Sequence, residues 1–156
     1  MSNVCSAFGH REVYQNIALK LDAIIGELIV NKGVSTFFTG GMGDFDKLFS
    51  SSVRRAQKIN SDIKLILVKP YLSAEINDHK SYYKNLYNSI IIPEELCNAH
   101  YKSAITKRNK WMIDNSNYVI TYVCHNFGGA YSAMRYAQEK GKLYMNIADK
   151  KTAFSK

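Results

Sequence analysis

Two glycine turns hold the residues of this sequence with the clearest chemical use. One is Thr39-Gly40-Gly41-Met42-Gly43 and the other is Phe127-Gly128-Gly129-Ala130, and each follows an apolar run. Glycine lets the main chain turn tightly and approach a ligand. A helix that follows presents free N–H groups and its positive dipole end to an anion. The arrangement favours a phosphate-bearing ligand, and the alternative is a tight strand-to-helix connection that binds nothing.

Arg108 and Asn109 are a polar pair suited to complete such a site. A guanidinium group binds phosphate or carboxylate through two parallel hydrogen bonds, and an amide both donates and accepts. The alternative for Arg108 is a solvated ion pair, for instance with Asp114, because most arginines on helix surfaces are exposed.

Asp46 is a candidate to accept hydrogen bonds from ribose hydroxyl groups, as the acidic residue of dinucleotide-binding folds does. It could equally cap the helix that starts nearby, and for Asp44 we favour the capping role. Gly9, His10 and Arg11 follow the first apolar run of the chain, so they could face the same crevice. A histidine that only caps its loop is the alternative there.

These motifs lie at the ends of predicted strands. Apolar runs and helical spacings alternate along the chain and predict strands and helices in turn. The predicted strands are Val4–Phe8, Val34–Phe38, Lys64–Val68, Ser89–Ile92, Tyr118–Val123 and Leu143–Asn146. The predicted helices are Glu12–Lys32, Phe45–Ile59, Tyr101–Asn115 and Gly129–Lys140, and the polar segment Tyr71–Asn88 is predicted to be a loop with one helical turn.

The alternation of strands and helices predicts the fold class. Nearly continuous apolar strands imply an α/β, Rossmann-like fold: a doubly wound, mainly parallel sheet of about six strands with helices on both faces. Ligands of such folds bind outside the carboxyl ends of the strands. Because residues 9–11 and both glycine turns follow strands, we expect them to meet at this edge.

Length and composition limit the class of protein. A chain of 156 residues with 46% apolar content fits one domain, residues 1–156, with a single core. The sequence contains neither an apolar run long enough to span a bilayer nor a secretory signal pattern, so we expect a cytoplasmic protein without membrane association. The cysteines Cys5, Cys97 and Cys124 are widely spaced, which predicts reduced, buried thiols.

The formal net charge of +8 favours acidic partners but does not choose among nucleotides, nucleic acid and anionic lipid. The lysines are scattered, with one small cluster around Arg108, so no continuous nucleic-acid track is predicted.

A zinc site is not expected, because Cys97, His100, Cys124 and His125 would all have to converge. Most tyrosines should fill the core, but one or two of four could stack on a base: Tyr82, Tyr83, Tyr87 and Tyr101.

Taken together, the motifs resemble the YpsA-like branch of the SLOG superfamily. The resemblance covers nearly the whole chain and is carried by Gly9-His10-Arg11, residues 39–46, Lys107-Arg108-Asn109 with Asp114, and Gly128-Gly129-Ala130 leading into Tyr136-Ala137. The superfamily is named after the Smf/DprA DNA-processing proteins and the LOG phosphoribohydrolases. Its members have a Rossmann-like fold, and many are thought to bind nucleotides or nucleotide-derived signals. The resemblance therefore implies a binding role for Arg108 and for the glycine turns.

Two departures from the related enzymes bear on activity. LOG enzymes carry Pro-Gly-Gly-x-Gly-Thr-x-x-Glu at the late glycine turn, and the glutamate takes part in hydrolysis. Here the stretch reads Phe127-Gly128-Gly129-Ala130-Tyr131-Ser132-Ala133-Met134-Arg135, without that glutamate. Ala130 also replaces the usual threonine, whose hydroxyl could bond a phosphate. Enzymatic activity therefore stays open, and the case for tight binding at this turn is weaker.

We predict a protein that binds a nucleotide or nucleotide-derived molecule and acts as a sensor, carrier or sequestering protein, with no cofactor and no metal. One alternative is an enzyme that hydrolyses the N-glycosidic bond of a nucleotide, with Asp46 stabilising positive charge on the sugar. Another is binding of single-stranded nucleic acid, which we do not favour. Relatives pair through helices, which implies a homodimer. The predicted ligand-binding residues are Gly9, His10, Arg11, Thr39, Gly40, Gly41, Met42, Gly43, Asp46, Arg108, Asn109, Gly128, Gly129 and Ala130.

Overall fold

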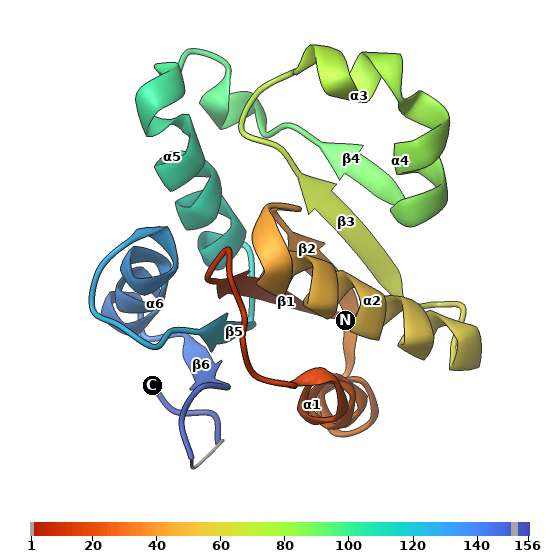
Figure 1. The fold of residues 1–156 in the computed structure, drawn as a ribbon, viewed down its shortest axis with the longest axis vertical. Coiled ribbons are helices and arrows are strands. Elements are labelled where there is room, and N and C mark those ends of the chain that lie inside the picture. The colour runs from red at the N-terminus through yellow and green to blue at the C-terminus, as the bar shows by residue number, and fades with distance from the viewer. Residues whose placement is uncertain (1, 151–152) are drawn as a thin grey trace.

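A parallel β-sheet forms the centre of the protein. The computed structural model describes residues 2–150 and 153–156, and in this part of the chain the sheet has six strands in the order β4-β3-β2-β1-β5-β6. Every pair of neighbouring strands is parallel (Figure 1). The prediction of a doubly wound α/β sheet is confirmed. The strands are β1 (Asn3–Gly9), β2 (Val34–Thr39), β3 (Lys64–Val68), β4 (Ser89–Ile91), β5 (Tyr118–Tyr122) and β6 (Leu143–Asn146).

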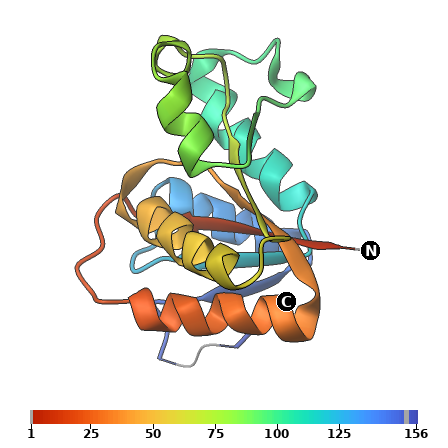
Figure 2. The same ribbon diagram turned by 90° about the vertical axis from the view of Figure 1, so that its right-hand side faces the viewer.

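Helices cover both faces of the sheet. Helices α1 (Ala18–Lys32) and α2 (Gly43–Ile59) pack on one face, and α5 (Tyr101–Asp114) and α6 (Gly129–Glu139) pack on the other (Figures 1 and 2). The short helices α3 (Ala74–Asp78) and α4 (Lys80–Leu86) lie beside β3 and β4, followed after β4 by a 3-10 turn at Glu94–Leu96. This arrangement leaves the carboxyl ends of β1, β2 and β5 uncovered by a long helix.

The core is divided by the sheet because successive strand residues face opposite sides. Phe37 packs with Leu21 and Phe49 on the face of α1 and α2, whereas Phe38 packs with Met112 and Ala133 on the face of α5 and α6. Each fully buried side chain of this size stabilises the fold by about 1.5–3 kcal/mol. The nearly continuous apolar strands of the sequence are therefore explained by burial on both sides.

The start of the first helix differs from the prediction. The helix begins at Ala18 and not at Glu12, although Val13 and Ile17 continue its apolar spacing. The main-chain carbonyls of His10 and Arg11 accept hydrogen bonds from the first N–H groups of α2, which hold residues 10–17 as an extended loop. A tertiary contact here prevails over local periodicity.

The segment Tyr71–Asn88 also differs, since it contains two helices where we predicted a loop with one turn. Ile76 and Tyr83 are buried against Leu67 of β3 and form a small separate core. The segment buries too few apolar residues to show a clear helical period, which is why the pattern was not visible in the sequence.

The thiols are only partly as predicted. Cys5, Cys97 and Cys124 are free, but only Cys5 is buried, and the other two are exposed because they follow the last turn of a 3-10 segment and the end of a strand. None of the described helices is long and apolar enough to traverse a bilayer.

Candidate functional site

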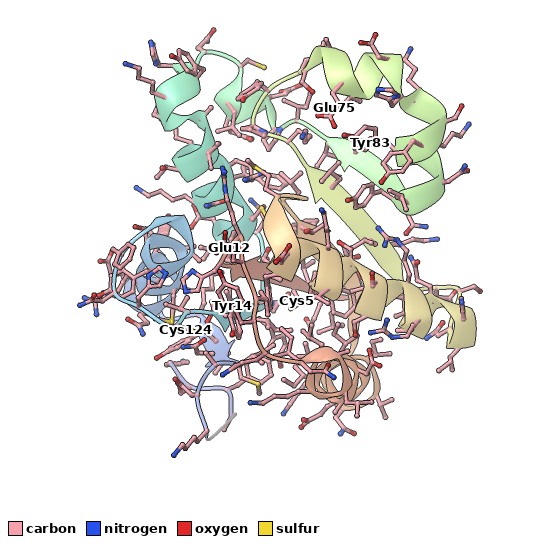
Figure 3. All side chains as sticks on the ribbon, viewed as in Figure 1. Cys5, Glu12, Tyr14, Glu75, Tyr83 and Cys124 are labelled. Carbon is pink, nitrogen blue, oxygen red and sulfur yellow. The ribbon has the colours of Figure 1, made fainter. Side chains whose placement is uncertain are left out.

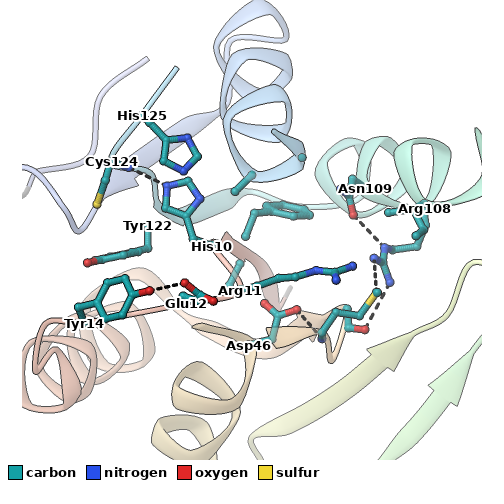
Figure 4. Close-up of a pocket in the computed structure, with 18 residues that line it drawn as sticks. His10, Arg11, Glu12, Tyr14, Asp46, Arg108, Asn109, Tyr122, Cys124 and His125 are labelled. Carbon is teal, nitrogen blue, oxygen red and sulfur yellow. Dashed lines mark hydrogen bonds between the residues drawn. The ribbon is translucent and has the colours of Figure 1, made fainter. Parts of the chain in front are cut away.

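A cavity of about 550 Å³ opens at the carboxyl edge of the sheet, where ligands of such folds bind (Figure 4). It is bordered by the loops after β1, β2 and β5 and by one side of α5. Most of the predicted ligand-binding residues line it: Gly9, His10, Arg11, Gly40, Met42, Asp46, Arg108, Asn109, Gly129 and Ala130.

Four of the predicted residues lie outside this lining. Thr39 is fully buried in β2, and its hydroxyl accepts a hydrogen bond from the N–H of Gly41 at 3.2 Å. Gly41 and Gly43 have positive φ angles and turn toward Leu67 and Arg11, respectively. Gly128, also at positive φ, precedes the first turn of α6. These residues shape the turns around the cavity but do not face it.

Arg108 reaches from the middle of α5 to the ends of β2 and β3. Its Nη1 donates to the carbonyl oxygens of Val68 at 2.9 Å and Gly40 at 3.4 Å, and its Nε donates to Oδ1 of Asn109 at 2.8 Å. The side chain is only 3% exposed. A Cβ atom on residue 40 would lie 2.8 Å from Nη1, so a larger residue there would displace the guanidinium group from its present position. The alternative of a solvated arginine is wrong.

Arg108 makes no ion pair with a carboxylate in the part of the chain that the structure describes, although the charge of Asp46 acts on it across the cavity. Among the described residues the only ion pair joins Arg55 to Asp22 at 2.7 Å. Burial lowers the pKa of Arg108, but the guanidinium group keeps its proton at any physiological pH. A buried charge is costly unless it is paired, so an anion in the cavity would be stabilised by this group.

Asp46 lies on the first turns of α2 and also lines the cavity. It is 7% exposed, and its Oδ2 accepts a hydrogen bond from the N–H of Met42 at 2.8 Å. Burial raises the pKa of Asp46 to about 7, although the Met42 N–H and the charge of Arg108 both lower it. The carboxyl group can therefore gain or lose a proton near neutral pH, a property of groups that act in binding or proton transfer. The hydrogen bond from the Met42 N–H to Asp46 caps the start of α2, which is the alternative role considered for this residue.

Asp44 has a different role from the one predicted. Its Oδ2 accepts from the N–H of Val13 at 3.2 Å, so the carboxylate fastens the loop of residues 10–17 and does not cap its own helix. The prediction of a cap was wrong because the partner lies 31 residues away in sequence.

The turn between β2 and α2, Gly40–Gly43, has few free N–H groups. The N–H of Gly41 is bonded to Thr39, and that of Met42 is bonded to Asp46. Within the helix, the N–H of Asp44 donates to the Arg11 carbonyl at 2.8 Å and that of Phe45 donates to the His10 carbonyl at 3.4 Å. The protein itself thus uses most of the donors that a phosphate would need here.

After β5 the N–H groups of Val123 and Cys124 are bonded to Asn146 and His10, but the first N–H groups of α6 are free. No group in the described part of the chain accepts from the N–H of Gly129, Ala130 or Tyr131, and the first turn of α6 contains no acidic residue. Gly129 and Ala130 line the cavity. This helix end therefore presents unpaired donors and a positive dipole to a ligand.

His10 connects the loops after β1 and β5. Its Nε2 accepts a hydrogen bond from the N–H of Cys124 at 2.8 Å, so this nitrogen carries no proton. Burial and the neighbouring His125 lower the pKa of His10, in agreement with a neutral ring. The ring of His10 stacks on that of His125 at 3.9 Å.

Several residues that line the cavity were not predicted. Glu12 and Tyr14 belong to the loop that we took for helix, and the Tyr14 hydroxyl donates to Oε2 of Glu12 (Figure 4). Figure 3 shows both near the centre of the molecule, in the loop before α1 and away from Glu75 and Tyr83 of α3 and α4. The sequence rule that ligand loops follow strands could have identified two more, Cys124 and His125.

The four tyrosines considered for base stacking do not line the cavity. Tyr83 and Tyr87 pack on each other, with ring centroids 6.4 Å apart, and Tyr82 and Tyr101 are exposed elsewhere. The phenyl and phenol rings at the cavity are instead those of Phe8, Tyr14 and Tyr122, beside the imidazole rings of His10 and His125.

Comparison with known proteins finds similarity both in sequence and in structure. No protein-family model matches the chain. The chain is 29% identical over 137 residues to YoqJ, an uncharacterized SPbeta prophage-derived protein of Bacillus subtilis (strain 168), and the match covers 77% of this chain and 79% of that protein.

The fold is similar to that of DNA processing protein A from Helicobacter pylori, which was described for its single-stranded DNA binding mode. The TM-score is 0.64 at 20% sequence identity, and the match covers 92% of this chain. It spans 64% of the length of the other chain, so about a third of that chain has no counterpart here. The Rossmann-like part of the SLOG resemblance thus agrees with a solved structure, and the YpsA-like branch stays a prediction. The chain has the α/β fold of DNA processing protein A over nearly all of its length.

Proposed function

We propose that this protein binds a nucleotide or nucleotide-derived phosphate ligand in the cavity at the carboxyl edge of the sheet. The observation that carries the proposal is Arg108, a buried cation that lines the cavity and has no carboxylate partner among the described residues. An anionic ligand would compensate this charge. The volume of about 550 Å³ lies within the range of small-molecule sites.

The free N–H groups of Gly129 and Ala130 support a phosphate at the start of α6. Asp46 and Asn109 line the same cavity and would bond the polar groups of a sugar, and Arg108, which also lines it, would bond the phosphate. Because the donors of the turn between β2 and α2 are already bonded, we assign the phosphate to α6 and Arg108 and not to that turn.

Calorimetric titration with AMP, GMP, CMP and UMP tests this function. We expect saturable binding by the wild type and a loss of about 10- to 100-fold in affinity for Arg108→Gln, since a charge-assisted pair of hydrogen bonds is lost. Arg54→Gln is the matched control, because Arg54 also donates to a main-chain carbonyl, at 3.1 Å, but does not line the cavity. Arg108→Lys keeps the charge and should bind with intermediate affinity if Arg108→Gln does not fold. Absence of binding by the wild type, or equal effects of the two glutamine variants, would contradict the proposal.

The same titrations distinguish binding from catalysis. Release of free base over time, followed by chromatography, would show the N-glycosidic hydrolase that we considered as the alternative. We expect the mononucleotides to be recovered unchanged, because the residue at the place of the catalytic glutamate of LOG enzymes is not acidic.

Single-stranded DNA binding is a second candidate, favoured by a basic groove between α5 and α6. The groove has a volume of about 540 Å³ and contains Lys110, Arg135 and Lys140. The ammonium groups of Lys110 and Lys140 lie 5.3 and 5.4 Å from the centre of the Tyr136 ring. Cations beside an aromatic ring suit a nucleic-acid backbone and its bases.

Oligothymidylates of increasing length test this candidate. DNA binding predicts an affinity that rises with length, falls steeply with salt and is lost in Lys110→Glu/Lys140→Glu. The control Lys58→Glu/Lys64→Glu changes the net charge equally at residues outside the groove. Equal effects of the two double variants would indicate nonspecific attraction.

A further inference from the structure

Three aromatic rings form a column at the rim of the cavity. The ring centroids of His10 and His125 are 3.9 Å apart with an interplanar angle of 15°, and those of His125 and Phe127 are 3.9 Å apart at 17°. His10 and His125 line the cavity, and Phe127 is the next ring outward. Close, nearly parallel rings at this spacing are stacked and not merely adjacent.

The two histidine rings are fixed by main-chain hydrogen bonds. Nε2 of His10 accepts from the N–H of Cys124 at 2.8 Å. Nδ1 of His125 lies 3.0 Å from the carbonyl oxygen of Phe127, which can only accept, so Nδ1 carries the proton. The column is therefore held in place before any ligand arrives, and binding on it costs little ordering entropy.

The outer end of the column is uncovered. Phe127 is 65% exposed, whereas Phe37, Phe45 and Phe49 are completely buried. It also stands immediately before Gly128 and the free N–H groups of α6, to which we assign the phosphate. A ring with one stacked and one open face, beside an anion site, is the arrangement that binds a flat base joined to a phosphate.

We infer that the exposed face of Phe127 is the base subsite of the ligand and that the ligand is a purine nucleotide. The inference rests on the proposed function. A purine covers more of the phenyl ring than a pyrimidine, so stacking on Phe127 selects the larger base. In this arrangement Phe127 binds the base, and the N–H groups of α6 and the Arg108 side chain bind the phosphate.

Titration of AMP, GMP, CMP and UMP, with ribose 5-phosphate as their common base-free part, tests this subsite. For the wild type we expect AMP and GMP to bind more tightly than CMP and UMP. We expect Phe127→Ala to weaken AMP binding by about tenfold, the loss typical of one stacked base, and to leave binding of ribose 5-phosphate unchanged. Phe127 is exposed, so the variant should unfold at the same denaturant concentration as the wild type.

Two further variants separate stacking from simple apolar contact. Phe127→Trp keeps a flat aromatic face and should retain AMP affinity, whereas Phe127→Leu keeps apolar surface and should lose it like Phe127→Ala. Bound AMP should also quench the fluorescence of the new tryptophan relative to the Trp111 background. Equal affinity of Phe127→Leu and wild type for AMP would overturn the stacking role.

The outcomes distinguish this inference from the proposed function. If AMP and ribose 5-phosphate weaken equally in Phe127→Ala, the phenyl ring only holds the turn and the base subsite is overturned, while phosphate binding stands. If all four mononucleotides bind the variant as tightly as the wild type, the subsite is again overturned alone. If none of them binds the wild type, both fail together. Sedimentation that shows a monomer for Phe127→Ala but a dimer for the wild type would assign the exposed ring to a second copy of the chain, which also overturns the inference.

Discussion

The two glycine turns of this protein resemble each other in sequence but differ in their hydrogen bonds. The turn between β2 and α2 uses its N–H groups internally, on Thr39, Asp46 and the loop after β1. At the turn between β5 and α6, the N–H groups of Gly129, Ala130 and Tyr131 have no acceptor among the described residues, and the first helical turn contains no acidic residue. The first turn therefore holds the edge of the sheet together, and the second is available to a ligand. A glycine turn before a helix becomes an anion site only if the rest of the protein leaves its donors unbonded.

The largest effect that separates the two turns is expected for Gly41→Val. Gly41 has a φ of 68°, which a β-branched residue avoids, and a Cβ atom there would lie 2.6 Å from Cδ1 of Leu67. Strain and overpacking together should lower the free energy of unfolding by about 4 kcal/mol, measured by urea denaturation.

Gly129→Val is the matched control in the other turn. No atom lies within 4 Å of a Cβ at residue 129, so we expect a loss below about 0.5 kcal/mol. Equal losses at both positions would show that the two turns do not differ in structural role.

Asp46→Asn should raise stability at neutral pH and above. Because burial raises the pKa of the native carboxyl to about 7, the native state binds its proton more tightly than the unfolded chain does. The stabilisation from this group is complete below about pH 4, the ordinary pKa of aspartate, and is lost as the pH rises to 7. Asparagine avoids this loss, and urea denaturation at pH 8 should show a gain of about 3 kcal/mol over wild type. A difference between the two proteins that does not change from pH 4 to 8 would contradict the raised pKa.

Ala130→Asp makes the second turn more like the first by adding an acidic residue to the start of α6. The new carboxylate should stabilise the helix by about 0.5 kcal/mol through the dipole and occupy the free donors. Repulsion of the ligand phosphate should lower AMP affinity by about tenfold, measured by calorimetry. Ala130→Asn has the same shape without the charge and should bind AMP nearly as the wild type does. Retained affinity in Ala130→Asp would place the phosphate elsewhere.

For His10→Ala we expect a smaller loss of stability than for Gly41→Val. The substitution removes the acceptor of the Cys124 N–H and should cost about 1 kcal/mol of stability at pH 8. The pKa of His10 is lowered, so its stabilisation is present above about pH 6.5 and is lost as the pH falls below that value. The pH dependence is therefore opposite to that of Asp46, whose stabilisation is lost as the pH rises. Urea denaturation of His10→Ala and Asp46→Asn from pH 4 to 8 would show whether the free energies of unfolding of the two variants, relative to wild type, change with pH in opposite directions.

Much of the fold could be predicted from the sequence because its determinants are local. The apolar runs gave the strands nearly to the residue, as at Lys64–Val68, and the alternation with helices gave the parallel sheet. The site was placed at the right edge because loops after parallel strands must gather there. The helix start at Ala18 and the pair α3 and α4 were missed, since contacts with α2 and with Leu67 decide them.

The sequence by itself determined the sheet, its layers and the edge at which glycine, arginine and histidine residues collect, because side-chain periodicity is fixed by burial along each element. Only the tertiary structure decided that Arg108 is buried without an ion pair among the described residues, and that the first N–H groups of α2 are bonded whereas those of α6 are free. It also decided that Phe127 ends a column of rings. Each of these depends on groups that are far apart in the chain, and such pairings leave no periodic trace in the sequence.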